Sequence, residues 1–303
     1  MGHVGYRTGQ FSDPNRRAWE GETARPLAWS AWFPTSSPGA NAKHAMNPVF
    51  QLGPVIADAD LSDDEKFSVV LLSHGTGGSP ESLGWLARSL AERGYLVIGA
   101  HHHGNTGREP YRAEGFLCWW ERATDLSELL THHAQSGPFA GRLDLSRVHA
   151  IGFSLGGYAA LALAGATTSV DLYLVWAELA GVSDDLPREF PNLGAHVRRL
   201  LETSPVFRDA WARQGDSFAD PRIRSIITMA AAPAVRGFHP ETVSSITLSV
   251  TLITGEADTE APSKDCSDWL LQQNPGFTRF SVGEHVGHYT FLGHPAGPVD
   301  AAQ

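Results

Sequence analysis

The chain has 303 residues, of which 42% are hydrophobic and 18% charged, with 31 glycines and 19 prolines. This composition is typical of a globular protein and excludes collagen, a coiled coil and a disordered chain. The net charge of −10 at pH 7 is opposite to the basic surface that phosphate binding needs, so nucleic acid is not an expected partner.

The cysteines and the apolar windows exclude further classes of protein. Cys118 and Cys266 are the only two cysteines and form no CxxC pair, so neither a disulfide framework nor a cysteine zinc site is indicated. No window reaches the roughly 18 apolar residues of a membrane span. The first 22 residues lack the apolar segment of a signal peptide. We therefore expect a cytoplasmic protein without a membrane span.

The first half of the chain predicts a mostly parallel sheet. Residues 4–11 and 27–33 are expected to form an antiparallel hairpin at the sheet edge. From residue 67 onward, short apolar runs alternate with helical patterns, as they do in βαβ units. The run 67–73 is apolar at nearly every position, which predicts a strand whose two faces are both covered by helices.

Further elements follow in the same alternation. A helix is expected to begin after Ser79-Pro80 and to end at Gly94, since proline suits the first helical position and glycine the end. The other expected strands are residues 95–100, 147–153, 223–229, 248–254 and 277–282. The other expected helices are one around 126–130, residues 154–165, residues 262–273, and a final helix after the last strand.

Residues 166–220 interrupt this alternation. They contain three prolines and mixed helical fragments, with no clear strand. We expect them to form an inserted cap of helices and loops over the carboxyl edge of the sheet. The whole chain, residues 1–303, is then a single α/β domain with this insertion.

Ser154 stands in Gly152-Phe153-Ser154-Leu155-Gly156, which matches GxSxG between an expected strand and an expected helix. The glycines are needed because the turn from strand to helix is sharp, and a Cβ at either position would crowd the backbone. The turn exposes the serine hydroxyl, and the first N–H groups of the helix favour an oxyanion beside it. We expect a nucleophile here; a glycine-rich turn around a surface serine is the alternative.

A neutral serine is a poor nucleophile, so it needs a base and an acid that orients the base. In sheets that carry this turn, the partners follow in the order serine, acid, histidine, from loops at the carboxyl edge. Asp258 comes directly after strand 248–254 and is the expected acid. Its competitors are Glu256 and Glu260, which flank it, and Asp184 in the cap region.

The base is expected in the loop between strand 277–282 and the final helix. His288 has the required place in the chain order. His285 lies three residues earlier in the same loop and remains the alternative.

The run Ser73-His74-Gly75-Thr76-Gly77-Gly78 follows the first buried strand. Its glycines let the main chain approach a substrate, so we expect the N–H groups of Thr76 and Leu155 to form an oxyanion hole. His74 is expected to hold this loop by a hydrogen bond. A phosphate loop is not indicated, because the run lacks the GxxxxGK[ST] spacing and its lysine.

Two other clusters have structural interpretations. The adjacent histidines 101–103 cannot all reach one ion, because neighbouring strand residues point to opposite faces, so no metal is expected. We expect them to line the entrance of the pocket. Trp119 and Trp120 are expected to pack in the core, and the neighbouring Glu121, Arg122 and Asp125 to form an ion pair.

The motifs LLSHGTGG, AHHHGNTG, ERATDLSELL, GFSLGG, GEADTEAP and GHYTFL occur in an order that resembles the α/β-hydrolase superfamily. Within it, the chain is similar over residues 4–293 to the predicted dienelactone-hydrolase group related to plasma-type platelet-activating-factor acetylhydrolases. The resemblance implies a triad of Ser154, Asp258 and His288 and an oxyanion donor at Thr76. True dienelactone hydrolases use a cysteine nucleophile, whereas this chain has Ser154.

These observations together predict a serine carboxylic-ester hydrolase that acts on small to medium soluble esters and needs no cofactor. The alternatives are a platelet-activating-factor or phospholipid acetylhydrolase, a lactonase and a polyester hydrolase. A catalytically silent binding module with the same fold is the alternative outside the enzyme class. The preference for soluble esters depends on a polar cap without an apolar surface stripe for docking to lipid.

Overall fold

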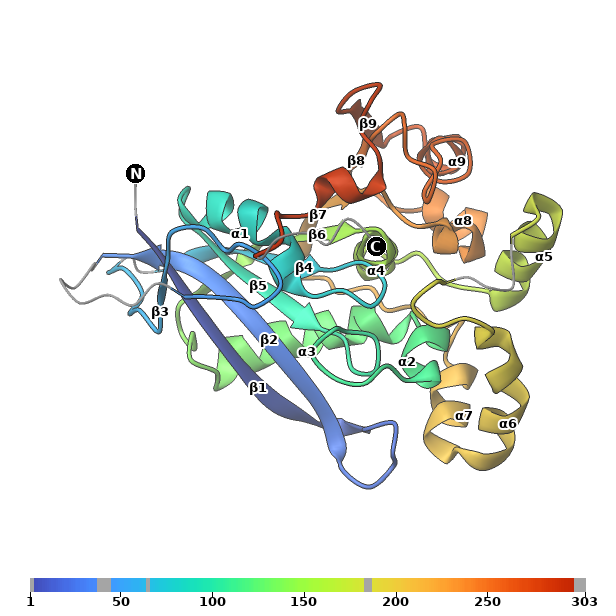
Figure 1. Ribbon diagram of the computed structural model, residues 1–303, viewed down its shortest axis with the longest axis horizontal. Helices are drawn as coiled ribbons and strands as arrows, with labels where there is room; N and C mark the ends of the chain where they lie inside the picture. Colours follow the sequence, from blue (N-terminus) through green and yellow to red (C-terminus); the bar gives the residue numbers. More distant parts are fainter. Residues whose placement is uncertain (1–2, 37–44, 64–65, 183–186, 297–303) are drawn as a thin grey trace.

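The computed structural model describes residues 3–36, 45–63, 66–182 and 187–296. One mixed sheet runs through the described part, in the order β3-β1-β2-β5-β4-β6-β7-β8-β9 (Figure 1). The strands are β1 (His3–Arg17), β2 (Ala24–Thr35), β3 (Val55–Ala57), β4 (Phe67–Ser73), β5 (Tyr95–His101), β6 (Leu143–Phe153), β7 (Ile223–Met229), β8 (Ser249–Thr254) and β9 (Thr278–Ser281). Strands β4 to β9 are parallel to one another, and the hairpin of β1 and β2 joins them through an antiparallel pairing of β2 with β5. The predicted α/β fold is confirmed.

Helices cover both faces of this sheet. They are α1 (Gly84–Ala91), α2 (Ala113–Leu117), α3 (Glu121–Gln135), α4 (Leu155–Leu163), α5 (Val170–Ala180), α6 (His196–Thr203), α7 (Pro205–Ala212), α8 (Pro240–Ser244) and α9 (Ser267–Gln273). Short 3-10 turns are η1 (Pro80–Leu83), η2 (Leu193–Ala195), η3 (Pro233–Gly237) and η4 (His288–Phe291). None of the described helices is both long and apolar enough to cross a bilayer.

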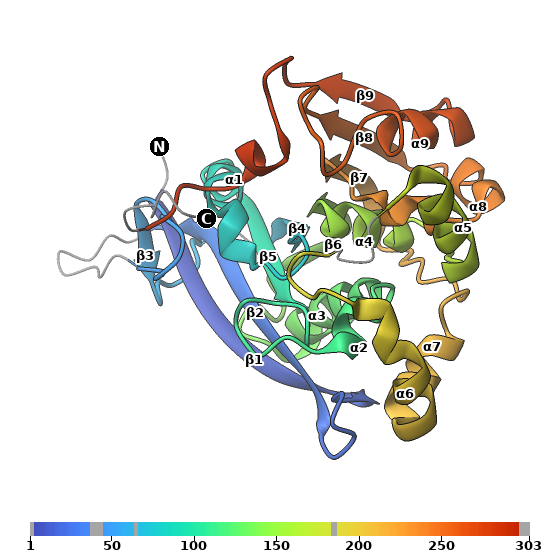
Figure 2. The ribbon, with the colours of Figure 1, turned by 45° about the vertical axis from the view of Figure 1, so that its right-hand side comes forward.

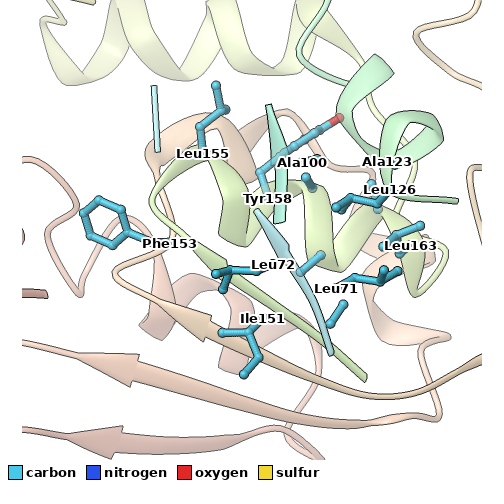
Figure 3. Packing of buried hydrophobic residues seen from close by; sticks show 14 of the residues in the cluster. Leu71, Leu72, Ala100, Ala123, Leu126, Ile151, Phe153, Leu155, Tyr158 and Leu163 are labelled. Atoms are coloured by element: carbon cyan, nitrogen blue, oxygen red, sulfur yellow. The ribbon is translucent and has the colours of Figure 1, made fainter. Parts of the chain in front are cut away.

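The alternation of side chains along β5 assigns the two helical layers. Ala100 points towards Ala123 and Leu126 of α3 (Figure 3). The neighbouring Gly99 faces the opposite side, where a Cβ would overlap the ring of Pro80 in η1. The buried core therefore lies on both sides of the parallel strands, which explains why the sequence of β4 is apolar at nearly every position.

The order of the strands defines where a site can form. From β4 the chain goes to its neighbour β5 and then crosses to β6 on the other side of β4. The loops after β4 and β6 therefore leave the sheet in opposite directions. A crevice opens at such a point outside the carboxyl ends of the strands.

Most strands and helices form where the sequence predicts them, although several extend beyond the predicted ranges: β1 continues to Arg17 and β6 begins at Leu143. Strands β4 and β7 match their predicted ranges residue for residue. The helix predicted over 262–273 forms only from Ser267, because Pro262 and the residues after it make turns. The described residues after β9 contain the 3-10 turn η4 in place of the final helix, and residues 297–303 lie outside the described ranges.

Residues 166–182 and 187–220 contain helices and no strand of the sheet. Helices α5, α6 and α7 gather at the end of the molecule opposite β3 (Figures 1 and 2). This segment was predicted as a polar cap. In the structure, however, Leu174, Val175 and Leu179 of α5 are exposed, the last of them to 84%.

His133, on the buried face of α3, is a polar residue within an aromatic cluster. Its ring lies 4.6 Å from that of Trp29 and 5.1 Å from that of Phe139, measured between centroids. Neither ring nitrogen has a hydrogen-bond partner among the described residues. Burial, together with the neighbouring charge of His132, lowers the pKa of His133 to about 3.

We expect His133→Leu to reduce the loss of stability in acid. In the unfolded chain, this histidine binds a proton when the pH is below its ordinary pKa of 6.5. In the folded protein, it stays neutral until the pH falls to about 3. The free energy of unfolding therefore falls as the pH falls between these values. One such group contributes a slope of about 1.4 kcal/mol per pH unit. Urea unfolding of both proteins between about pH 6 and pH 4 measures this slope. Equal slopes would mean that His133 is protonated in the folded state.

Candidate active site

Ser154 lies at the turn between β6 and α4 with φ 53° and ψ −120°, a conformation that is strained for a residue with a side chain. Hydrogen bonds hold this turn. The Ser154 N–H donates to the Met229 carbonyl at 2.9 Å, and the Ser154 carbonyl accepts from Gly157 at 2.8 Å and Ala232 at 3.0 Å. The surrounding backbone therefore maintains the strained turn and the direction of the serine side chain.

The two glycines of the GxSxG motif are sterically required. A Cβ on Gly152 would overlap the Gly156 carbonyl, and a Cβ on Gly156 would overlap the Ser73 carbonyl. The second contact is between the serine turn and the end of β4. These glycines therefore allow both the sharp turn and its contact with the neighbouring loop.

A continuous hydrogen-bonded chain joins three of the predicted side chains. The Nε2 atom of His288 lies 3.0 Å from Ser154 Oγ, and its Nδ1 atom lies 2.9 Å from Asp258 Oδ2. All three residues are buried, with exposed fractions between 7% and 8%. His288 begins the turn η4, and its ring packs 4.8 Å from the ring of Phe153.

The turn after β8 holds the Asp258 carboxylate. Its Oδ1 atom accepts hydrogen bonds from the N–H groups of Glu260 at 3.0 Å and Ala261 at 2.8 Å, so Oδ2 faces His288. Burial alone raises the pKa of Asp258. The hydrogen bonds from His288 and the two N–H groups outweigh burial, so the pKa lies below its ordinary value. Asp258 is therefore ionised at neutral pH.

The competing residues have other surroundings. His285 is exposed and has no hydrogen bond to Ser154 or Asp258 among the described contacts. Glu256 pairs with Arg279 at 2.7 Å, and Glu260 pairs with Arg188 at 2.8 Å. Asp184 lies outside the described residues.

The loop after β4 packs against the serine turn. A Cβ on Gly75 would lie 3.1 Å from the ring of Phe153 and 3.3 Å from Cβ of Ser154. Thr76 follows Gly75, and Leu155 follows Ser154 at the start of α4. Among the hydrogen bonds of the described residues, none uses the N–H of Thr76 or Leu155. Both groups lie on segments next to Ser154.

His74 holds this loop, as its sequence position suggested. Its Nδ1 atom donates to the Gly75 carbonyl at 2.7 Å, and its Nε2 atom faces the N–H of His102 at 3.5 Å. Burial, followed by the charge of Arg122, lowers the pKa of His74 well below its ordinary value. His74 is therefore neutral, with its proton on Nδ1.

The expectation that residues 101–103 line the pocket entrance stays a prediction, since no described contact joins them to Ser154, Asp258 or His288. All three histidines are buried, and each has different partners. His101 contacts Ser30 and Thr106, His102 contacts Ser73 and Asp125, and His103 contacts Glu109 and Trp19. His101 ends β5 and the other two follow it in a turn, so the three side chains meet different buried partners. In the described part of the chain, no group of three or more His, Cys, Asp and Glu side chains is arranged to hold a metal ion.

The ion pair expected within α3 also differs. Asp125 pairs with Arg25 at 2.9 Å and with Arg16 at 2.8 Å, both from the β1–β2 hairpin. Arg122 instead points towards the loop after β4, where it donates to the His74 carbonyl at 2.6 Å. This contact was not expected from the sequence. The sequence signal for it is an arginine one helical turn before Leu126, on the side of α3 that faces the core.

Residues 187–190, which follow helix α5, contact segments around Ser154. The rings of Phe190 and Phe116 lie 5.3 Å apart, and the side chain of Glu189 lies beside Gly77. Arg188 pairs with Glu260, two residues after Asp258.

Two surface cavities, of ≈ 270 Å³ and ≈ 200 Å³, are lined by residues other than the three of the hydrogen-bonded chain.

Comparisons with known proteins support the fold. Residues 69–302 match the model of the family described as "Alpha/beta hydrolase family". A ferulic acid esterase from Streptomyces cinnamoneus is similar in structure, with a TM-score of 0.59 and 17% sequence identity, over 96% of this chain and 76% of that one. No curated protein matches the chain.

We expect Gly156→Ala to destabilise the protein by about 3 kcal/mol or more, because the new Cβ would overlap backbone atoms that cannot move independently. Gly194→Ala is the matched control, since a Cβ there meets nothing within 4 Å. Urea unfolding measures both. Equal stability of the two variants would contradict the close contact between the serine turn and β4.

Proposed function

This chain belongs to the alpha/beta hydrolase family, and we propose that it is a serine carboxylic-ester hydrolase that forms an acyl-enzyme. The observation that carries the proposal is the hydrogen-bonded chain from Asp258 through His288 to Ser154. A nucleophile, a base and a group that orients the base are the components of acyl transfer. The similarity to a ferulic acid esterase supports the same class of reaction.

In the first half of the reaction, His288 Nε2 takes the proton from Ser154 Oγ as the oxygen attacks the ester carbonyl. Asp258 holds the imidazolium through Nδ1. The carbonyl oxygen becomes an oxyanion, and the N–H groups of Thr76 and Leu155 donate to it. When the intermediate collapses, the proton on Nε2 passes to the leaving alcohol, and the acyl group remains on Ser154.

In the second half, His288 takes a proton from water, which attacks the acyl-enzyme and forms a second oxyanion in the same place. Collapse of this intermediate returns the proton to Ser154 Oγ and releases the carboxylic acid. No step needs a metal or an organic cofactor.

The resemblance of the sequence motifs supports a relationship to the dienelactone-hydrolase group and the plasma-type platelet-activating-factor acetylhydrolases. Lactone, phospholipid and polyester substrates remain alternatives within the same chemistry. A silent binding module is disfavoured, because such a module would have no need for the ordered contacts of Ser154, His288 and Asp258.

We further propose that residues 166–220 cap the site and that the enzyme prefers short acyl groups. The contacts of Glu189 with Gly77, and of Arg188 with Glu260, bring this segment against the loops that carry Thr76 and Asp258. Such contacts narrow the approach to Ser154.

One observation favours a second candidate, an enzyme for esters presented at an apolar surface. Leu174, Val175 and Leu179 leave one face of α5 apolar and exposed, contrary to the polar cap expected from the sequence. An exposed apolar helix face can lie against aggregated lipid or polymer. Acyl-chain specificity separates the two candidates.

We expect Ser154→Ala to abolish ester hydrolysis and labelling by a fluorophosphonate, while the fold is retained. His288→Ala and Asp258→Asn should each lower kcat for a nitrophenyl ester by on the order of 10⁴-fold, as groups that act as a unit do. His285→Ala is the matched control and should remain near wild type, because this side chain is exposed and contacts neither partner. Wild-type protein that resists labelling would favour the binding module.

The specificity constants for nitrophenyl acetate, butyrate, octanoate and palmitate should fall beyond the short acyl groups. In an open apolar pocket, each added methylene would instead strengthen binding by about 0.8 kcal/mol. The double variant Val175→Ser/Leu179→Ser tests the apolar face, with Leu145→Ser, an exposed leucine on β6, as the control. A maximum at octanoate or longer that the double variant abolishes would establish the second candidate instead.

A further inference from the structure

Arg122 is a buried cation whose hydrogen bonds go to the main chain. Its side chain is 2% exposed, and the described ion pairs give it no carboxylate partner. Its guanidinium donates to the carbonyls of His74 at 2.6 Å, Gly75 at 3.3 Å and Asn105 at 3.5 Å. Burying a charge costs free energy unless hydrogen bonds compensate it. The contacts with the main chain supply this compensation and indicate a specific role for Arg122.

The carbonyl of Gly75 belongs to the same peptide unit as the N–H of Thr76. Three donors meet at this carbonyl: His74 Nδ1 at 2.7 Å, Arg122 Nη2 at 3.3 Å and the N–H of Gly78 at 3.3 Å. In a planar trans peptide, the C=O and the N–H point in opposite directions. Fixing the Gly75 carbonyl on the inner side therefore fixes the Thr76 N–H on the outer side.

Three further polar groups of this loop are also occupied. The Gly77 N–H donates to Asn105 Oδ1 at 2.6 Å, and the Gly77 carbonyl accepts from the Tyr111 hydroxyl at 2.8 Å. The Gly78 carbonyl accepts from the N–H of Gly107 at 2.9 Å. The contacts described for this loop leave the Thr76 N–H without an acceptor, beside Ser154.

We propose that Arg122 is a positioning residue for the oxyanion hole: with His74, it holds the Gly75–Thr76 peptide so that the Thr76 N–H points at the oxyanion. The inference rests on the proposed function, in which Thr76 is an oxyanion donor. Arg122 touches neither substrate nor Ser154 and acts only through this peptide.

The chemistry of arginine suits this role. Its planar fork reaches several carbonyls at once, which the single ammonium of a lysine cannot do. Burial lowers the pKa of Arg122 to about 9, and nearby Asp125 opposes this shift, so the guanidinium is charged at neutral pH. A positive charge at the carbonyl end polarises the peptide and makes its N–H a stronger donor.

The first test is Arg122→Lys. A lysine keeps the charge but cannot make the set of contacts that fixes the peptide. Loss of one oxyanion donor lowers kcat by about 10²-fold or more, and we expect a fall of this order with KM nearly unchanged. Arg222→Lys is the matched control, because Arg222 also binds α3, through Thr131 Oγ1 at 3.0 Å and the Ser127 carbonyl at 3.1 Å, away from the loop.

A second measurement distinguishes positioning from a general loss of structure. A trifluoromethyl ketone forms an oxyanion with Ser154, so its affinity should fall in proportion to kcat/KM in Arg122→Lys. The affinity of the corresponding amide, which forms no oxyanion, should remain unchanged. Equal losses for both ligands, or wild-type kcat in Arg122→Lys, would overturn the inference.

A pair of His74 variants tests the same peptide from its other donor, and serves if Arg122→Lys fails to fold. His74→Leu removes the 2.7 Å hydrogen bond to the Gly75 carbonyl and should reduce kcat and ketone affinity together. His74→Asn has an amide N–H near the former Nδ1 position and should restore much of both. Wild-type kcat in His74→Leu would overturn the inference. A wild-type enzyme that neither hydrolyses esters nor reacts with a fluorophosphonate would refute the proposed function itself, and this inference with it.

Discussion

The parallel pairing of β4 with β6 is the constraint on which the site depends. Its register sets Ser73 opposite Gly152, so the loop after β4 and the turn at Ser154 begin at the same level of the sheet. Because the strand order reverses here, the two segments leave in opposite directions around a common crevice. The contact of Gly156 with the Ser73 carbonyl then holds them together, and the loops after β8 and β9 bring Asp258 and His288 to the same crevice.

A layer of buried polar side chains lies beneath the loop after β4. Burying these side chains costs a large desolvation free energy, which their hydrogen bonds offset only when each group has its partner. Asp125 pairs with Arg25, Arg16 and His102, whereas Arg122 donates hydrogen bonds to main-chain carbonyls. Burial, followed by the charge of Arg122, lowers the pKa of His102 to about 3, so this histidine stays neutral beside the cation. The layer thus contains an ionised carboxylate, hydrogen-bonded arginines and neutral histidines, and it lies beneath the backbone of the loop after β4.

Residues 187–190 contact the loops around Ser154. Their described contacts there include Glu189 beside Gly77 and the pair of Arg188 with Glu260. Arg188 is 68% exposed, and exposed ion pairs contribute about 0–1 kcal/mol.

The sequence by itself determined the features that depend on neighbouring residues. Apolar runs defined β4 and β7, and the glycines at positions 152 and 156 indicated the sharp turn at Ser154, since backbone sterics act over a few residues. The order of the loops indicated Asp258 and left two histidines open. Only the tertiary structure brought His288, and not His285, within hydrogen-bond distance of Ser154, gave the histidines 101–103 separate partners and directed Arg122 to the loop after β4. The reason is physical: these side chains meet partners from distant segments, and which nitrogen faces which oxygen depends on how strands, helices and loops pack in three dimensions.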